Sequence, residues 1–143
     1  MSSKSHERTQ ERRIALQVLY QGEILDTSPL ELIEKKLLVD EDALMGDYAK
    51  GLLIGCIDHT KDIDTYLVAA SENWAIDRMP LVDKSLLRLA TFEMKYVDDV
   101  PVSVAINEAV NLAKEFGGAD SPRFVNGILG RIAVQLEEEV ASE

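Results

Sequence analysis

The sequence predicts an all-α protein of about seven helices, and three observations carry that prediction. Apolar residues recur at spacings of three and four through most of the 143-residue chain, which is the period of a helix that buries one face. Each of the four prolines stands where such a stretch begins, a position at which the missing proline N–H costs nothing. Asn126-Gly127 is typical of a tight β-hairpin, but its apolar flanks are only two or three residues long, too short for strands.

Seven stretches of helical periodicity follow one another along the chain. They are expected over about residues 5–25, 29–38, 41–58, 60–71, 81–97, 102–116 and 122–138. The first has a polar first half, and its apolar stripe starts only at Ile14. The second begins with Ser28-Pro29, a hydroxyl N-cap followed by proline. The sixth has the most regular stripe and ends at Gly117-Gly118, a pair that stops helices.

Glycines inside these stretches need a reason, because each costs about 1 kcal/mol relative to alanine in a helix. Gly51 and Gly55 are four residues apart beside an apolar stripe. They predict a close approach of a neighbouring helix. Gly127 lies inside the last helix and is expected to be explained by close packing as well.

The charge is unevenly distributed. The net charge is −11, but residues 1–13 carry +2 and the rest of the chain carries −13. A chain this acidic does not hold a polyanion by bulk charge. A basic arm on an acidic body therefore predicts two kinds of partner, one anionic and one cationic. The alternative is that the acidic residues only keep the chain in solution.

The arm places its basic residues on one helical face. Lys4, Arg8 and Arg12 are spaced by four, with Arg13 alongside, and these side chains are expected to be exposed. Arginines on a helix commonly hold RNA phosphates and stack on unpaired bases. The alternative is a solvated helix start in which Glu7 and Glu11 offset part of the charge.

No set of residues typical of an enzyme is visible, and no cofactor is expected. Glu93 stands in an apolar stripe without a catalytic partner and is expected to be structural, paired with Arg78 or Arg88. Cys56 and His59 are too few ligands for a metal site, and Cys56 is expected in the core. The apolar runs are too short to cross a membrane and no signal peptide is present, so the cytoplasm is the expected compartment.

Several strings of residues resemble the NusB transcription antitermination family. The longest are VAINEAVNLAKEFG and FVNGIL, at residues 104–117 and 124–129. Residues 12–20, the 74–78 loop, and residues 86–90 with Glu93 are also similar to the family. The resemblance spans nearly the whole chain and its motifs are long and specific.

The resemblance implies one all-helical NusB-like domain over 1–143, with two subdomains at roughly 1–77 and 78–143. It implies a factor that binds the single-stranded boxA element of ribosomal RNA transcripts together with NusE, a small-subunit ribosomal protein. It also implies work within the RNA polymerase antitermination complex. The family includes both monomers and dimers, so a homodimer is allowed.

The resemblance also implies site residues. On the RNA side these are Arg8 and Arg12, with Lys4 and Arg13 beside them in the arm, then Asp120, Arg123 and Phe124. Phe124 lies on an apolar stripe and is equally well explained as core. Tyr20 and Asp83 match the NusE contact. Asp83 is off its helix's stripe, so it is expected to face outward.

Two other functions stay open. One is a NusB-like accessory module of ribosomal RNA modification, because RNA methyltransferases can carry such a domain at their N-terminus. This chain ends at Ser142-Glu143 with no catalytic domain after it. The other is a helical scaffold that binds only proteins. Binding of boxA RNA with and without NusE separates these functions.

Overall fold

The computed structural model describes residues 3–34, 45–72 and 74–142, and the side chains from residue 6 onward in these ranges. The helices are α1 (Ser3–Leu25), α2 (Pro29–Glu34), α3 (Asp47–Asp58), α4 (Thr60–Ala70), the 3₁₀ turn η1 (Ile76–Arg78), α5 (Leu81–Tyr96), α6 (Val102–Phe116) and α7 (Ser121–Ala141). The described ranges contain no strand, and their seven α-helices follow the predicted order. The predicted extensions into residues 35–44 lie outside the described residues.

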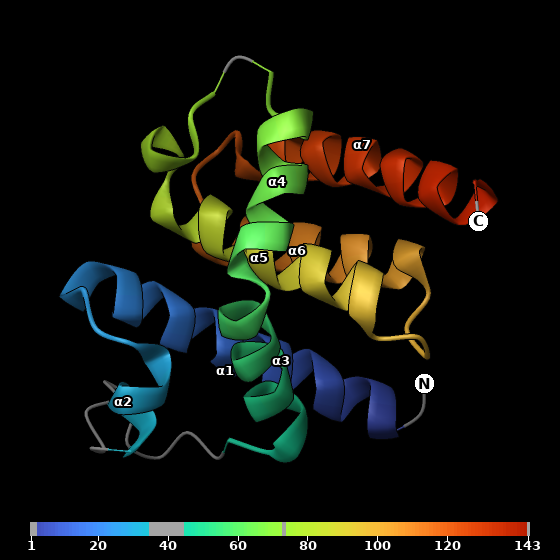
Figure 1. Ribbon diagram of the computed structural model, residues 1–143. Coiled ribbons are helices and arrows are strands. Elements are labelled where there is room, and N and C mark those ends of the chain that lie inside the picture. The colour runs from blue at the N-terminus through green and yellow to red at the C-terminus, as the bar shows by residue number, and fades with distance from the viewer. Residues whose placement is uncertain (1–2, 35–44, 73, 143) are drawn as a thin grey trace.

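α5 is the central helix. It packs against α1, α3 and α4 as well as α6 and α7. In Figure 1, α1, α2 and α3 occupy the lower half, and α4 to α7 the upper half. One cluster of buried apolar side chains runs through α1 and α3 to α7. This cluster includes buried residues on both sides of residues 77 and 78, where the boundary between the two subdomains is expected.

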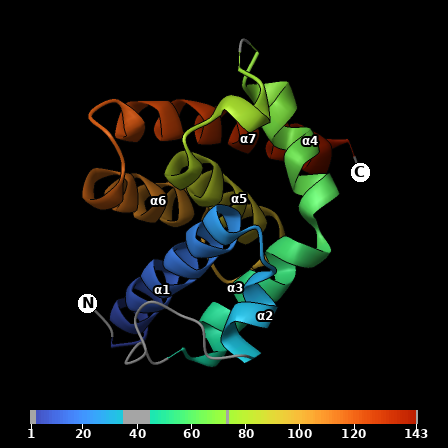
Figure 2. The same cartoon turned by 90° about the vertical axis from the view of Figure 1, so that its left-hand side faces the viewer.

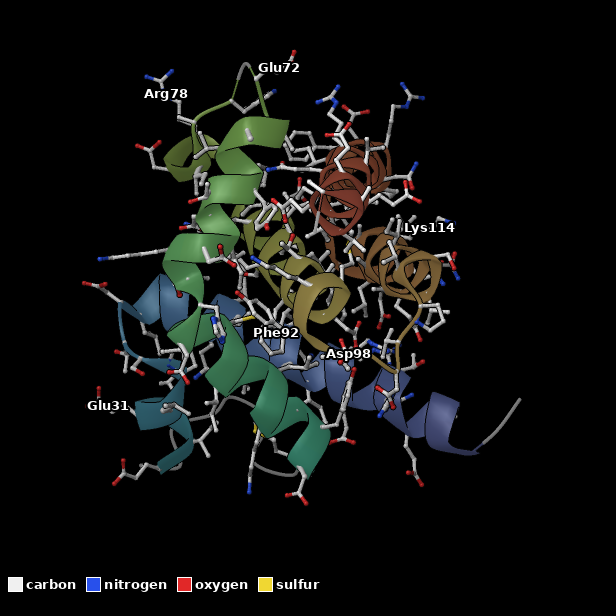
Figure 3. All side chains as sticks on the ribbon, turned by 45° about the vertical axis from the view of Figure 1, so that its right-hand side comes forward. Glu31, Glu72, Arg78, Phe92, Asp98 and Lys114 are labelled. Atoms are coloured by element: carbon white, nitrogen blue, oxygen red, sulfur yellow. The ribbon has the colours of Figure 1, made fainter. Side chains whose placement is uncertain are left out.

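α3 approaches α5 closely at a glycine. A Cβ on Gly55 would lie 2.1 Å from the Phe92 ring, and Figure 3 shows Phe92 between these two helices. The predicted close approach is therefore confirmed at Gly55. It is wrong at Gly51 and at Gly127, which are exposed and have open space where a Cβ would stand.

An acidic residue of the arm holds the start of α3. The Ala49 N–H donates to Glu11 Oε1 at 3.1 Å. A carboxylate is favourable there because the first N–H groups of a helix have no partner within it. The missing side chain of Gly46 makes space for this carboxylate, since a Cβ on Gly46 would lie 2.2 Å from the same Glu11 oxygen. Glu11 thus ties α1 to α3.

A short turn joins α6 to α7. The Gly117 N–H donates to the Ala113 carbonyl at 2.9 Å, which confirms the predicted stop of α6. The Gly118 N–H then donates to the Ser121 hydroxyl at 3.0 Å. Asn126-Gly127 lies inside α7, so the helical reading of this segment is confirmed.

Candidate nucleic-acid interface

The arginines of the predicted arm all pair with carboxylates of α5, α6 and the loop between them. The closest N···O distances are 3.0 Å for Arg8 with Asp99, 2.9 Å for Arg12 with Glu93 and with Glu108, and 2.8 Å for Arg13 with Glu115. The side chain of Lys4 lies outside the described residues. The first half of α1 is therefore held against the molecule by ion pairs, where the sequence predicted an exposed arm.

Arg12 is buried, with only 6% of its surface exposed. Its Nε reaches both carboxylate oxygens of Glu93 at 2.9 Å, and the Tyr48 hydroxyl donates to the same carboxylate. The predicted exposure of Arg12 is wrong, because its position on α1 faces α5. Glu93 is structural as expected, but its partner is Arg12, and neither Arg78 nor Arg88.

Arg8 and Arg13 are held more loosely. Their side chains are 19% and 30% exposed, and their partners Asp99 and Glu115 are 57% and 45% exposed. The Arg8 guanidinium also lies over the Tyr48 ring, 4.4 Å from its centre. Exposed ion pairs contribute about 0–1 kcal/mol. Both arginines can therefore exchange their carboxylates for phosphates at little cost.

The predicted site residues of α7 lie in its first turns, after the end of α6 where Glu115 pairs with Arg13. Asp120 and Arg123 are exposed, and Phe124 is partly buried. Arg13 pairs with Glu115 close to the end of α6. Figure 1 shows the α6–α7 turn at the left of the view and the start of α1 at the right, whereas Figure 2, turned by 90°, shows both at the left.

Sequence reasoning missed two residues beside Phe124. The Trp74 indole packs edge-on against the Phe124 ring at 5.9 Å between centres, and it remains 53% exposed. Arg131, two turns after Phe124, donates to the Ala70 carbonyl at 2.7 Å. Trp74 and Arg131 line a hollow of about 370 Å³ together with Arg123 and Phe124. The one signal in the sequence that could have indicated this surface is the single tryptophan of the chain, which lies in a loop.

The two residues expected at the protein partner differ in exposure. Tyr20 on α1 is 36% exposed. Asp83 in the first turn of α5 is only 3% exposed, so its predicted outward position is wrong. Burial raises the pKa of Asp83, and a hydrogen bond from Ser121 in the first turn of α7 partly offsets this rise. The first turn of α5 faces α7 at Asp83. Helical spacing alone could not show this, because it does not tell which neighbouring helix covers a residue.

Other candidate groups have structural surroundings. Cys56 is buried as predicted, and burial raises the pKa of its thiol to about 12. In the described part of the chain, no group of three or more His, Cys, Asp or Glu side chains is placed to hold a metal ion. None of the helices in the described ranges has the length and apolarity that crossing a bilayer requires.

The fold and surface define a class: a small all-helical protein that presents arginine and aromatic side chains together, as single-strand nucleic-acid binders do. The chain belongs to the NusB family, whose model matches residues 9–134. This is the family of transcription antitermination proteins that the sequence strings resemble, and the resemblance is thereby confirmed.

Several relatives match along most of the chain. The transcription antitermination protein NusB of Kineococcus radiotolerans is 41% identical over 135 residues, covering 94% of this chain and 98% of the relative. That of Geobacter sulfurreducens is 42% identical over 132 residues, covering 90% and 94%.

Solved structures share the fold. A NusB from T. maritima has a TM-score of 0.74 at 34% identity and covers 88% of this chain and 91% of its own. A chain from a crystal structure of the antitermination factors NusB and NusE in complex with dsRNA has a TM-score of 0.80 at 25% identity. It covers 94% of this chain and 99% of its own.

Proposed function

We propose that this chain is a cytoplasmic transcription antitermination factor that binds boxA-type single-stranded RNA together with the ribosomal protein NusE. The observation that carries the proposal is that Arg8 and Arg13 are only weakly paired, that Arg123 has no carboxylate partner among the described residues, and that the Phe124 ring is partly exposed beside Arg123. Arginines that are free, or only weakly paired, can hold phosphates, and an exposed aromatic ring can stack on a base. The solved complex of relatives with NusE and RNA supports the same partners.

The site residues then divide into two roles. Arg12 orients the first half of α1 through its buried pairs, so it acts as a positioning residue. Arg8 and Arg13 reach phosphates by giving up exposed carboxylates, and Arg123 adds a charge that has no carboxylate partner among the described residues. Asp120 is an exposed acceptor for base or ribose donors.

A basic ribosomal protein fits the acidic body of the chain. The net charge outside residues 1–13 is −13, which attracts a cationic partner and repels RNA. Tyr20 supplies an exposed aromatic contact for that partner. Asp83 is buried, so it contributes through the first turns of α5 and α7 and not by direct contact. Recruitment to the RNA polymerase antitermination complex follows from the RNA and NusE together.

The test is binding of boxA RNA with and without purified NusE. We expect weak RNA binding by the chain alone and much tighter binding with NusE. The basic partner neutralises RNA phosphates that find no positive charge on the acidic body of the chain. Equal affinity in both cases contradicts the proposal. Binding of NusE without any RNA binding would instead favour a protein-binding scaffold.

A further inference from the structure

The arginines of the described chain fall into two groups. Arg8, Arg12, Arg13 and Arg88 all pair with carboxylates. Among the described residues, Arg78, Arg123 and Arg131 have no carboxylate partner, although the chain carries a net charge of −11. Arg123 and Arg131 line the same hollow. Two arginines without a carboxylate partner therefore meet at one hollow on the surface.

The spacing on α7 shapes this hollow. Arg123, Gly127 and Arg131 follow one another at intervals of four, so they lie along one face of the helix. Gly127 has no side chain, and the space where its Cβ would stand is open. The two long cationic side chains thus border a gap over the helix backbone. Gly127 costs helix stability without any packing reason inside the chain, and a ligand that enters this gap supplies one.

One wall of the hollow is aromatic. The Trp74 indole is 53% exposed while its ring contacts Phe124, so a large part of a π surface faces the open space. A flat ring that stacks on an indole buries apolar area with little loss of conformational freedom. The helix backbone at Gly127 also lines the hollow, and the missing side chain permits close approach there.

Arg131 is already held in place. Its Nη1 donates to the Ala70 carbonyl at the end of α4, at 2.7 Å. The guanidinium has five donors in a planar fork, so others remain for an anion. Glu72 lines the same hollow and carries one negative charge against two positive ones. Figure 3 places Glu72 at the end of α4, near the top of the view.

We propose that this hollow is a subsite for one unpaired nucleotide of the bound RNA. The base stacks on Trp74 above Gly127, and Arg123 and Arg131 hold its neighbouring phosphates. A flat ring next to an anion fits a hollow that is lined by an indole and by two arginines without a carboxylate partner. This inference rests on the proposed RNA-binding function. It specifies the place on α7 at which one nucleotide of the RNA is bound.

The chain offers a direct readout, because Trp74 is its one tryptophan. The experiment follows indole emission of the full chain while boxA RNA is added, with NusE present and with NusE alone as the blank. Stacking of a base is expected to quench the emission at saturation. Binding affinity is measured in parallel by an independent method such as filter retention.

Two glycines of α7 supply a matched pair of variants. Gly127→Leu fills the hollow, and Gly130→Leu places the same side chain in open space on the same helix, away from the hollow. Gly127→Leu is expected to abolish the quenching and to weaken RNA binding roughly 10- to 100-fold, the size of one lost base stack. Gly130→Leu is expected to keep both. Both variants exchange a helical glycine for leucine, so both should fold.

The outcomes separate this subsite from the wider function. Tight RNA binding with unchanged Trp74 emission, or with full affinity in Gly127→Leu, overturns the subsite and leaves the proposed function intact. Failure of the unsubstituted chain to bind boxA RNA with NusE overturns both. Quenching by NusE in the absence of RNA assigns the hollow to the protein partner and also overturns the subsite.

Discussion

The three arginines of α1 differ in role because their surroundings differ. Arg12 and Glu93 are both removed from water, and the guanidinium satisfies both carboxylate oxygens. Arg8 and Arg13 keep much of their hydration beside partly exposed partners. The same residue type therefore anchors the helix at one position and stays available for a ligand at two others.

Removing Arg12 is expected to destabilise the fold strongly. Arg12→Ala leaves Glu93 buried without its cation, which costs about 3–5 kcal/mol. Arg8→Ala is the matched control and is expected to cost about 1 kcal/mol or less. Urea unfolding of both variants measures the difference. Similar small losses in the two variants would show that the Arg12 pair is not an anchor.

Asp83 gives a stability effect that depends on pH. Its pKa is raised by burial, so its charged form is a cost to the folded state at neutral pH. This cost disappears as the pH falls toward the carboxyl's pKa in the unfolded chain. Asp83→Asn is therefore expected to be more stable than the unsubstituted chain at neutral pH, with an advantage that shrinks on acidification. Thermal melts across this range test it, and an advantage that grows on acidification contradicts it.

The packing of α3 on α5 depends on one backbone approach. Gly55 brings the two helices together over Phe92, whereas Gly51, one turn earlier, faces solvent. Two glycines in the same helix thus have opposite environments. Helical spacing could only place them near a stripe, because it does not show where a neighbouring ring lies.

These two glycines predict opposite effects of the same substitution. Gly55→Ala forces a methyl group into the Phe92 ring and is expected to destabilise the protein by about 1–3 kcal/mol. Gly51→Ala meets nothing and is expected to stabilise it by about 0.5–1 kcal/mol through helix propensity. Urea unfolding of the two variants side by side is the measurement. Stabilisation by both changes would mean that α3 moves away from α5 without cost.

At the scale of the whole molecule, charge is both a structural and a functional feature. Carboxylates of α5, α6 and the loop between them neutralise the basic half of α1, and the surplus acidic charge lies elsewhere. RNA must therefore compete with these internal carboxylates for Arg8 and Arg13. A cationic partner shifts that competition by screening the acidic surface.

Removing one internal competitor is expected to strengthen RNA binding. Glu115→Gln frees Arg13 to contact a phosphate, and each such contact adds about 0.7 to the slope of log affinity against log salt. Glu138→Gln is the control. It removes the same charge from an exposed residue near the C-terminal end of α7. The expected result is a steeper slope and higher affinity for Glu115→Gln. Equal gains in both variants would indicate bulk charge only.

The sequence by itself determined the helices, their order and the family. Helical periodicity, proline starts and the Gly117-Gly118 stop are local signals, since they depend on residues within a turn or two of each other. The specific strings at residues 104–117 and 124–129 identified the family. Asp120, Arg123 and Phe124 followed as candidate site residues, because they lie within or directly before these strings.

Only the tertiary structure decided which charges are free. Arg12 meets Glu93 across 81 residues of chain, and no spacing rule tells which of three arginines faces the central helix. The same holds for Asp83, which α7 covers, and for the hollow that Trp74 forms with Arg131 on a distant helix. Burial and pairing depend on which helix faces build the core, and that choice is made by the packing of the whole chain.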